Sequence, residues 1–183
     1  GLGALSAARG GEDSRLARDL AALGVSADDI AVVSKHDTST SANDPNESDL
    51  HERIARALGR SAGNPLYVIS QKALTGHAKG GAAAFQLAGL SQVLRGGIVP
   101  PNRSLDCVDP ALRPHEHLVW LRQPLDLRAN PPKAGLVTSL GFGHVSALIA
   151  LVHPEAFVAA LAAERGKDAA RALSLIHISE PTR

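Results

Sequence analysis

Short runs of β-branched apolar residues alternate with longer segments whose apolar residues recur at helical spacing, and this alternation constrains the fold most. Residues 30–33 and 66–70 are the clearest runs, and each predicts a short buried strand. Between them, Leu50, Ile54 and Leu58 form one apolar stripe, which predicts a helix. Strands that alternate with helices indicate an α/β layered domain.

The same pattern continues along the chain. Leu16, Leu20 and Leu23 predict a helix that ends at Gly24. Further elements are expected as strands at residues 117–122, 134–139 and 144–152, a tight turn at 141–143, and a last helix from 154 to about 163. Small residues are so dense at 80–89 that we expect a helix packed closely on every side in the domain centre.

The helix over residues 44–58 has a recognisable start. Asp44 is expected to cap it, Pro45 suits its first position, and Glu47 stands three residues after the cap. No repeat or low-complexity linker divides residues 1–172, so we treat them as one folding unit.

Composition excludes several classes of function. With 44% hydrophobic residues and a net charge of +1, the chain is expected to be a soluble globular protein without strong attraction to nucleic acid or anionic membranes. No apolar run is long enough to cross a bilayer, and the N-terminus shows no signal peptide. The single cysteine excludes a disulfide framework and favours a reducing cytoplasm.

The two ends of the sequence are interpreted differently. The chain has no methionine and opens within a Gly/Ala-rich run, so we interpret it as a fragment. Residues 173–183 differ in composition from the preceding stretch and resemble the translated read-through of a transposase-type sequencing adapter. We expect a non-native tail there and exclude it from fold reasoning. An ordinary frayed C-terminal segment is the alternative.

Three short polar segments lie where predicted strands end, which is where open α/β sheets bind their ligands. They are residues 35–40, 72–81 and 139–144. In the first, His36 precedes several hydroxyl side chains, so an imidazole that can titrate lies beside small hydrogen-bonding groups. A plain polar loop is the alternative for this segment.

The other two segments carry a histidine and an aromatic residue. His77 is expected at a helix N-terminus, where the helix dipole would keep the imidazole neutral and able to donate a hydrogen bond. A capping histidine without a catalytic part is the alternative. Glycines on both sides of Phe142 allow unusual backbone angles there.

In order and spacing, these segments resemble the C-terminal signatures of β-ketoacyl synthases: His-Gly-Thr-x-Thr, then Lys-x-x-x-x-Gly-His, then Gly-Phe-Gly-Gly. The resemblance covers residues from about 25 to 165. The sequences of residues 43–47 and 76–83 are most similar to those of multidomain type I fatty acid synthases, and the bacterial form is closer than the fungal form. The resemblance implies a thiolase-like α/β fold, of which residues 1–172 would be the C-terminal half.

The resemblance also implies a reaction. In the family an acyl chain is loaded on a cysteine, malonyl on acyl carrier protein loses carbon dioxide, and the enolate attacks the acyl-cysteine. His36 and His77 match the two active-site histidines, whose N–H groups would stabilise the developing enolate. Lys72 matches the active-site lysine, and Glu47 matches the acidic residue that pairs with it. The capping role of Glu47 is compatible with this one.

Further positions follow from the same match. Thr38 and Thr40 match positions that hydrogen-bond the pantetheine arm, and Phe142 matches the gating phenylalanine, whose N–H helps form the oxyanion hole. The departures from the family pattern are Asp37 for glycine, Leu140 for phenylalanine and His144 for glycine. These departures indicate which subfamily the chain resembles more than they argue against activity. His144 is interpreted as a turn or packing residue.

The family's nucleophilic cysteine lies in the N-terminal half. Cys107 follows both histidines, so we interpret it as a structural or incidental thiol and do not expect the fragment alone to condense anything. The implied partners are the acyl carrier protein domain, the N-terminal half of the ketosynthase and a second copy of the synthase, with no nucleic acid or membrane. No metal or nicotinamide is expected, and phosphopantetheine arrives with its carrier.

There are three alternative interpretations. A thiolase shares the fold but places a catalytic cysteine near its C-terminus, where this chain has residues 141–144 without one. A non-catalytic partner subunit of the chain-length-factor type would have lost the upstream cysteine, although the match of His36, Lys72 and His77 argues against it. A metal site would rest on residues 115–117, for which no third ligand is evident.

Overall fold

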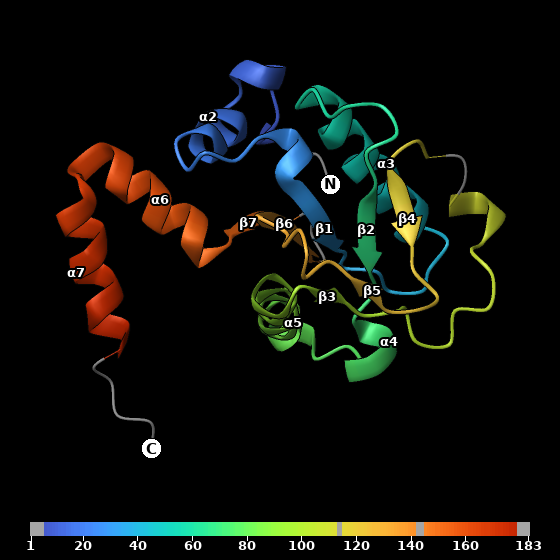
Figure 1. Cartoon of the computed structure of the whole chain (residues 1–183). Helices are drawn as coiled ribbons and strands as arrows, with labels where there is room; N and C mark the ends of the chain where they lie inside the picture. Colours follow the sequence, from blue (N-terminus) through green and yellow to red (C-terminus); the bar gives the residue numbers. More distant parts are fainter. Residues whose placement is uncertain (1–5, 113–114, 142–144, 179–183) are drawn as a thin grey trace.

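A five-stranded sheet forms the centre of the protein (Figure 1). The computed structural model describes residues 6–112, 115–141 and 145–178. The sheet has the order β4-β2-β1-β6-β7 and consists of β1 (Ile30–Ser34), β2 (Leu66–Ile69), β4 (Leu118–Trp120), β6 (Ala134–Leu140) and β7 (Ser146–Val152). β7 pairs antiparallel with β6, and the other pairings are parallel. The predicted α/β class is confirmed.

Helix α3 (Asp44–Ala57) packs on one face of this sheet and α5 (Ala82–Gly96) on the other. The other helices are α2 (Arg15–Ala21), α4 (Lys72–Thr75), α6 (Pro154–Arg165) and α7 (Lys167–Ile178). One-turn 3-10 helices are η1 (Gly11–Asp13), η2 (Ala27–Asp29), η3 (Lys79–Gly81) and η4 (Pro110–Leu112). A two-stranded antiparallel sheet joins β3 (Ile98–Val99) to β5 (Leu125–Asp126).

Strand residues alternate between two hydrophobic cores, because successive side chains of a strand point to opposite faces. Val33, Val68 and Leu136 belong to the core that contains Leu50 and Ile54 of α3. The core on the α5 side is made by Val32, Ile69, Leu90, Val93, Leu94, Val99 and Val137. The apolar stripe predicted for residues 44–58 is therefore the face by which α3 packs on the sheet.

Helix α5 lies close against the sheet at one glycine. A Cβ atom on Gly135 of β6 would stand 2.7 Å from Cδ1 of Leu90, so any larger residue there would force this leucine to shift. The opposite side of α5 is open, with Phe85 48% exposed and Ala84 and Ala88 also exposed. The prediction that this helix is packed on every side is wrong, because the described residues of the chain leave that face exposed.

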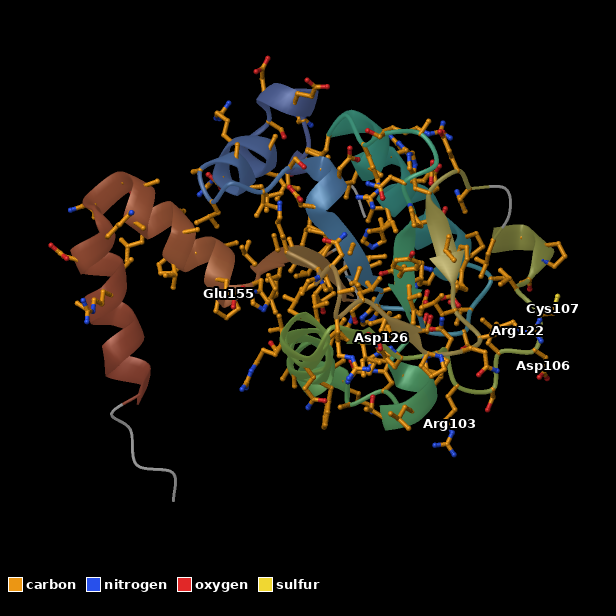
Figure 2. All side chains as sticks on the ribbon, in the orientation of Figure 1. Arg103, Asp106, Cys107, Arg122, Asp126 and Glu155 are labelled. Atoms are coloured by element: carbon orange, nitrogen blue, oxygen red, sulfur yellow. The ribbon has the colours of Figure 1, made fainter. Side chains whose placement is uncertain are left out.

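The chain leaves the sheet after β7 through α6 and α7, which extend away from the main body (Figure 1). Helix α7 runs continuously across position 172. Whether residues 173–183 are non-native stays a prediction. The connection from β3 to β4 carries Cys107 at the edge of the molecule, where it is exposed (Figure 2). Within the described ranges, each helix is too short or too polar to cross a membrane.

Candidate active site

The carboxyl ends of neighbouring parallel strands bring the predicted polar segments together. Residues 35–38 follow from β1, residues 70–72 follow β2, and Thr138 lies on β6, on the other side of β1. Parallel strands end at one edge of a sheet, which explains the meeting of distant segments. A cavity of about 370 Å³ opens here, lined among others by Thr38, Ser70, Lys72, His77, Asn102 and Trp120.

The structure places the two motif histidines side by side. His36 follows β1 and is buried, whereas His77 lies in the loop after α4 and is exposed. Their ring centroids are 5.1 Å apart, and the ring planes meet at 86°. The two imidazoles therefore stand edge to face in one site.

His77 is not at the start of a long helix, so that prediction is wrong. Helix α5 begins at Ala82, and the 3-10 turn η3 lies between it and the histidine. The field of a helix end falls off within about one turn, so the dipole of α5 does not act on the imidazole of His77. A local contact orients the ring instead, because the backbone N–H of Lys79 donates to Nδ1 of His77 at 3.0 Å.

Both rings have a donor at Nδ1. Nζ of Lys72 lies 3.3 Å from Nδ1 of His36 and also donates to the carbonyl oxygen of His36. A neutral imidazole has one N–H, so a ring that accepts at Nδ1 carries its proton on Nε2. Each neutral histidine therefore presents Nε2–H as its remaining donor.

The surroundings of His36 favour its neutral form. Burial lowers the pKa of His36 below its ordinary value of 6.5, and the nearby positive charge of Lys72 lowers it further, against the opposing effect of Glu47. Burial also lowers the pKa of Lys72, while Glu47 and Asp37 oppose that shift. At neutral pH, His36 is thus an uncharged hydrogen-bond donor.

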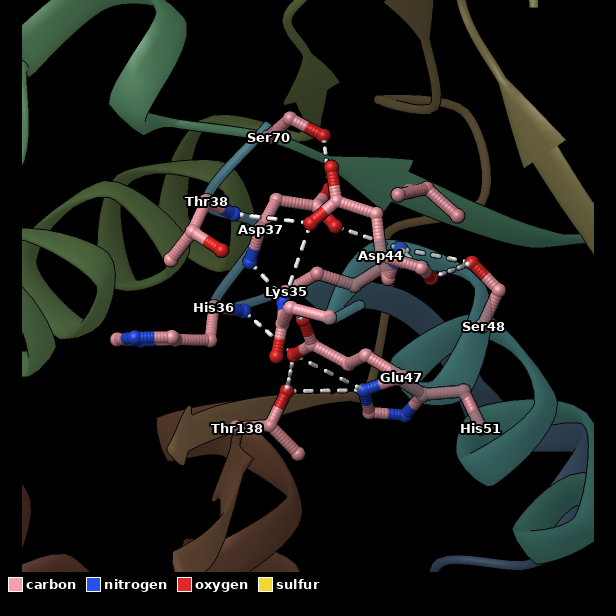
Figure 3. Close-up of polar contacts among 12 residues, drawn as sticks. Lys35, His36, Asp37, Thr38, Asp44, Glu47, Ser48, His51, Ser70 and Thr138 are labelled. Carbon is pink, nitrogen blue, oxygen red and sulfur yellow. Dashed lines mark hydrogen bonds and ion pairs between the residues drawn. The ribbon is translucent and has the colours of Figure 1, made fainter. Parts of the chain in front are cut away.

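Glu47 holds the backbone that carries His36 (Figure 3). Its carboxylate accepts the backbone N–H of His36 at 2.5 Å and that of Asp37 at 2.9 Å, as well as the hydroxyl of Thr138. The predicted capping role is wrong, because Asn43 is the N-cap and no side chain caps the helix there. Lys72 contacts His36 directly, and Glu47 acts on Lys72 through its charge, which opposes the effect of burial on the pKa of Lys72.

The surroundings of Asp37 explain how an aspartate can stand where the family pattern has glycine. Its φ of +24° lies in the region that favours glycine, which aspartate tolerates better than most residues. The carboxylate is paired with the fully buried ammonium of Lys35 at 2.6 Å and accepts the hydroxyl of Ser70 (Figure 3). Lys35 also donates to Ser48 at 2.8 Å and lies 5.8 Å from the ring of Trp120.

The two threonines have different surroundings. Thr38 lines the cavity, and its backbone N–H donates to Asp44 at 3.0 Å. The hydroxyl of Thr40 accepts the backbone N–H of Asn43 at 3.2 Å and lies 3.1 Å from the hydroxyl of Thr38. Asp44 therefore fixes the loop rather than capping α3. Phe142 and His144 lie outside the described residues, so their roles stay predictions.

Sequence reasoning missed Lys35, His51 and Thr138, all of which are buried in this network. Two signals were present in the sequence. Lys35 is a charged residue at the end of a buried strand, which requires a partner. His51 stands four residues after Glu47 on the same helix, and such residues are neighbours on one face.

Glu52 of α3 lies near residues 115–117, the possible metal site for which no third ligand is evident in the sequence. Ligand atoms of Glu52, Glu116 and His117 lie within 4.8 Å of one another. These groups already bind one another, because Nδ1 of His117 lies 3.0 Å from Glu52 and Arg56 pairs with both carboxylates. The arrangement serves as an ion-pair cluster that ties α3 to the start of β4.

The chain is similar to known proteins over most of its length. Fatty acid synthase alpha subunit pigJ of Monascus ruber is 45% identical over 150 residues, and alpha subunit pkiB of Emericella nidulans is 46% identical over 149 residues. Each match covers 81% of this chain but 8% of the relative, so the chain spans less than a tenth of those proteins.

Solved ketosynthases share the fold. The oxazolomycin ketosynthase domain of Streptomyces albus has a TM-score of 0.64 at 23% identity, over 71% of this chain and 23% of that one. The ketosynthase from module 6 of the bacillaene synthase of Bacillus subtilis has a TM-score of 0.64 at 18% identity, over 82% and 29%. The family pattern described as "Beta-ketoacyl synthase, C-terminal domain" matches residues 3–106. The chain therefore belongs to the β-ketoacyl synthases and contains their C-terminal domain.

Proposed function

We propose that this chain supplies the two-histidine half of the condensing site in a multidomain fatty acid synthase. The reaction is the decarboxylative Claisen condensation of acyl and malonyl thioesters on acyl carrier protein. The observation that carries the proposal is the pair of imidazoles 5.1 Å apart, each with Nδ1 occupied by a donor and Nε2–H left to point at a substrate.

Each step follows from ordinary thioester chemistry. The bond between C2 of malonyl and its carboxylate breaks, carbon dioxide leaves, and the electron pair forms an enolate on the thioester oxygen. Nε2–H groups of His36 and His77 stabilise this negative charge, which is where preorganised donors contribute most. The enolate carbon then attacks the carbonyl of the acyl-cysteine, and the cysteine thiolate leaves. That cysteine is supplied by the N-terminal half of the ketosynthase.

The substrate arrives on a phosphopantetheine arm carried by the acyl carrier protein. Thr38 lines the cavity beside Lys72 and His77, which supports a contact between its hydroxyl and the arm. Thr40 is proposed to join it through the hydroxyl pair that the two threonines form. Phe142 is proposed as the gate and as an N–H donor for the acyl-cysteine step. This half uses no resident metal or nicotinamide.

The wider setting is also a proposal. We place the chain in the cytoplasm, within a homodimeric synthase that contains its carrier domain. The relatives named above are fungal, so the closer likeness of residues 43–47 and 76–83 to the bacterial form stays a prediction from the sequence. The alternative of a non-catalytic partner subunit is decided by the upstream half, where loss of the cysteine would favour it.

The test uses the intact synthase with His77→Ala and, separately, His36→Ala. Release of labelled carbon dioxide from malonyl carrier protein should fall by about 10²–10³-fold in each variant, because one donor to the enolate is lost. Acyl loading on the cysteine should remain intact, which serves as the control for folding. Unchanged decarboxylation in the His77→Ala enzyme would contradict the assigned role.

A further inference from the structure

A buried chain of hydrogen bonds leads from His51 to the backbone of His36 (Figure 3). Nε2 of His51 lies 2.9 Å from the hydroxyl of Thr138, and this hydroxyl donates to Oε1 of Glu47. The same carboxylate accepts the N–H groups of residues 36 and 37. His51 and Thr138 are fully buried and Glu47 is 1% exposed, so water does not compete for these contacts.

The direction of each hydrogen bond follows from the number of protons available. Thr138 has one hydroxyl proton, which it gives to the carboxylate, so it can only accept from the imidazole. Nε2 of His51 must then carry the proton, and Nδ1 is the bare nitrogen. In the described part of the chain, Nδ1 of His51 has no hydrogen-bond partner. Burial lowers the pKa of His51 to about 3, which agrees with a neutral ring.

The chain joins three elements that carry the site. His51 and Glu47 lie on α3, Thr138 lies on β6, and His36 follows β1. Gln86 of α5 fixes the strand end as well, because its amide donates to the carbonyl oxygens of Lys35 and Thr138 at 2.8 and 3.1 Å. The hydroxyl of Thr138 is thereby held at one place relative to the backbone before His36.

We propose that His51 and Thr138 are positioning residues for the condensing site, which lock the Glu47 carboxylate in the orientation that holds the backbone of His36. The inference rests on the proposed function, because it concerns the same imidazole. The Nε2–H group of His36 acts on the substrate. His51 and Thr138 act only through Glu47. An ordered donor stabilises an enolate better than a mobile one, since less reorganisation is needed as charge develops.

The experiment compares matched substitutions in the intact synthase. Thr138→Val removes the hydroxyl at nearly constant volume, and Thr138→Ser keeps it. His51→Leu removes the donor, and His51→Gln keeps an N–H near the position of Nε2. We expect malonyl decarboxylation to fall about ten-fold in Thr138→Val and His51→Leu, as for the loss of one buried hydrogen bond, and to stay near wild type in Thr138→Ser and His51→Gln. KM for the malonyl carrier should change little.

A double-variant cycle gives the sharper readout. In a Glu47→Gln background, Thr138→Val should add little further loss, because the carboxylate that it positions is gone. Equal loss in the valine and serine variants, or full additivity with Glu47→Gln, would overturn the proposal. A fall in acyl loading that matches the fall in decarboxylation would show a merely structural role and would also overturn it.

The two proposals fail in different ways. If the wild-type synthase decarboxylates malonyl and His77→Ala lowers this activity by about 10²–10³-fold, the proposed function stands. Unchanged decarboxylation in Thr138→Val and His51→Leu would then refute only the positioning role. If His77→Ala leaves decarboxylation intact, the proposed function itself fails.

Discussion

Asp37 and Lys35 flank the catalytic candidate His36 and depend on each other. The position of Asp37 has a positive φ, where the family pattern has glycine. The aspartate brings a buried carboxylate, and burial raises its pKa from the ordinary 3.8 while the charge of Lys35 lowers it. Lys35 has no exposed surface, so its ammonium needs a negative partner within the protein. Relative to the family pattern, this chain thus replaces a glycine with Asp37, the acidic partner of Lys35 in an ion pair.

This dependence predicts a coupling between the two residues. Lys35→Met should weaken folding by about 3–5 kcal/mol, because it leaves the Asp37 carboxylate buried without its partner. The double variant Lys35→Met/Asp37→Gly should recover most of that loss, since both charges are gone and glycine suits the positive φ. Chemical denaturation followed by the fluorescence of Trp120, the single tryptophan, measures the effect. Additive losses in the double variant would contradict the coupling.

The pH dependence of decarboxylation should report His36. Because burial and the charge of Lys72 lower the pKa of this imidazole, the neutral donor should persist as pH falls through 6.5, and activity should be lost only at lower pH. Lys72→Met removes one of the lowering causes, so the pKa should rise and the acid limb should move to higher pH. A pH–rate profile of carbon dioxide release from the intact synthase checks this. An acid limb that stays in place would exclude the charge of Lys72 as a cause.

At the scale of elements, the strands were predictable and the surroundings of the helices were not. β-branched runs gave β1 and β2, and the apolar stripe gave α3, because these patterns depend on the burial of a single face. The predicted start of α5 at His77 is wrong, because the turn η3 lies between His77 and the first residue of the helix. Local spacing predicts a capping role for Glu47, which the structure does not show. Among the described residues, three of its four donors come from β6 and from the loop after β1, which no local pattern reveals, and the fourth is the side-chain amide of Asn43.

Contact between α5 and the sheet gives a prediction at this scale. Gly135→Ala should destabilise folding by about 1–3 kcal/mol, because its Cβ would meet Leu90 at 2.7 Å and the carbonyl oxygen of Val32 at 3.1 Å. Gly96→Ala, at the end of α5, is the matched control, since its Cβ would have nothing within 4 Å. Thermal unfolding of both variants separates the two cases. A Gly135→Ala protein as stable as the control would show that the helix can shift without loss.

At the scale of the molecule, α5 packs on the sheet with one side, while its far side is open. Leu74 is 66% exposed, Phe85 48% and Ile98 44%. Leu74 and Ile98 line one cavity of about 390 Å³, and the side chain of Gln71 donates to the carbonyl oxygen of Phe85, so the three residues belong to one surface. An apolar surface of this kind marks a site of association. In the proposed function, the N-terminal half of the ketosynthase covers it.

The isolated chain should therefore bind a hydrophobic dye through this surface. Dye fluorescence should fall by at least half in a Leu74→Ser/Phe85→Ser/Ile98→Ser variant, because the largest apolar side chains of the surface are removed. Phe157→Ser is the control, since Phe157 is 47% exposed but lies on α6, away from α5. Joining the N-terminal half in one polypeptide should suppress dye binding without any substitution. If the signal follows Phe157 instead, or persists when both halves are joined, the surface beside α5 is not the one that the missing half covers.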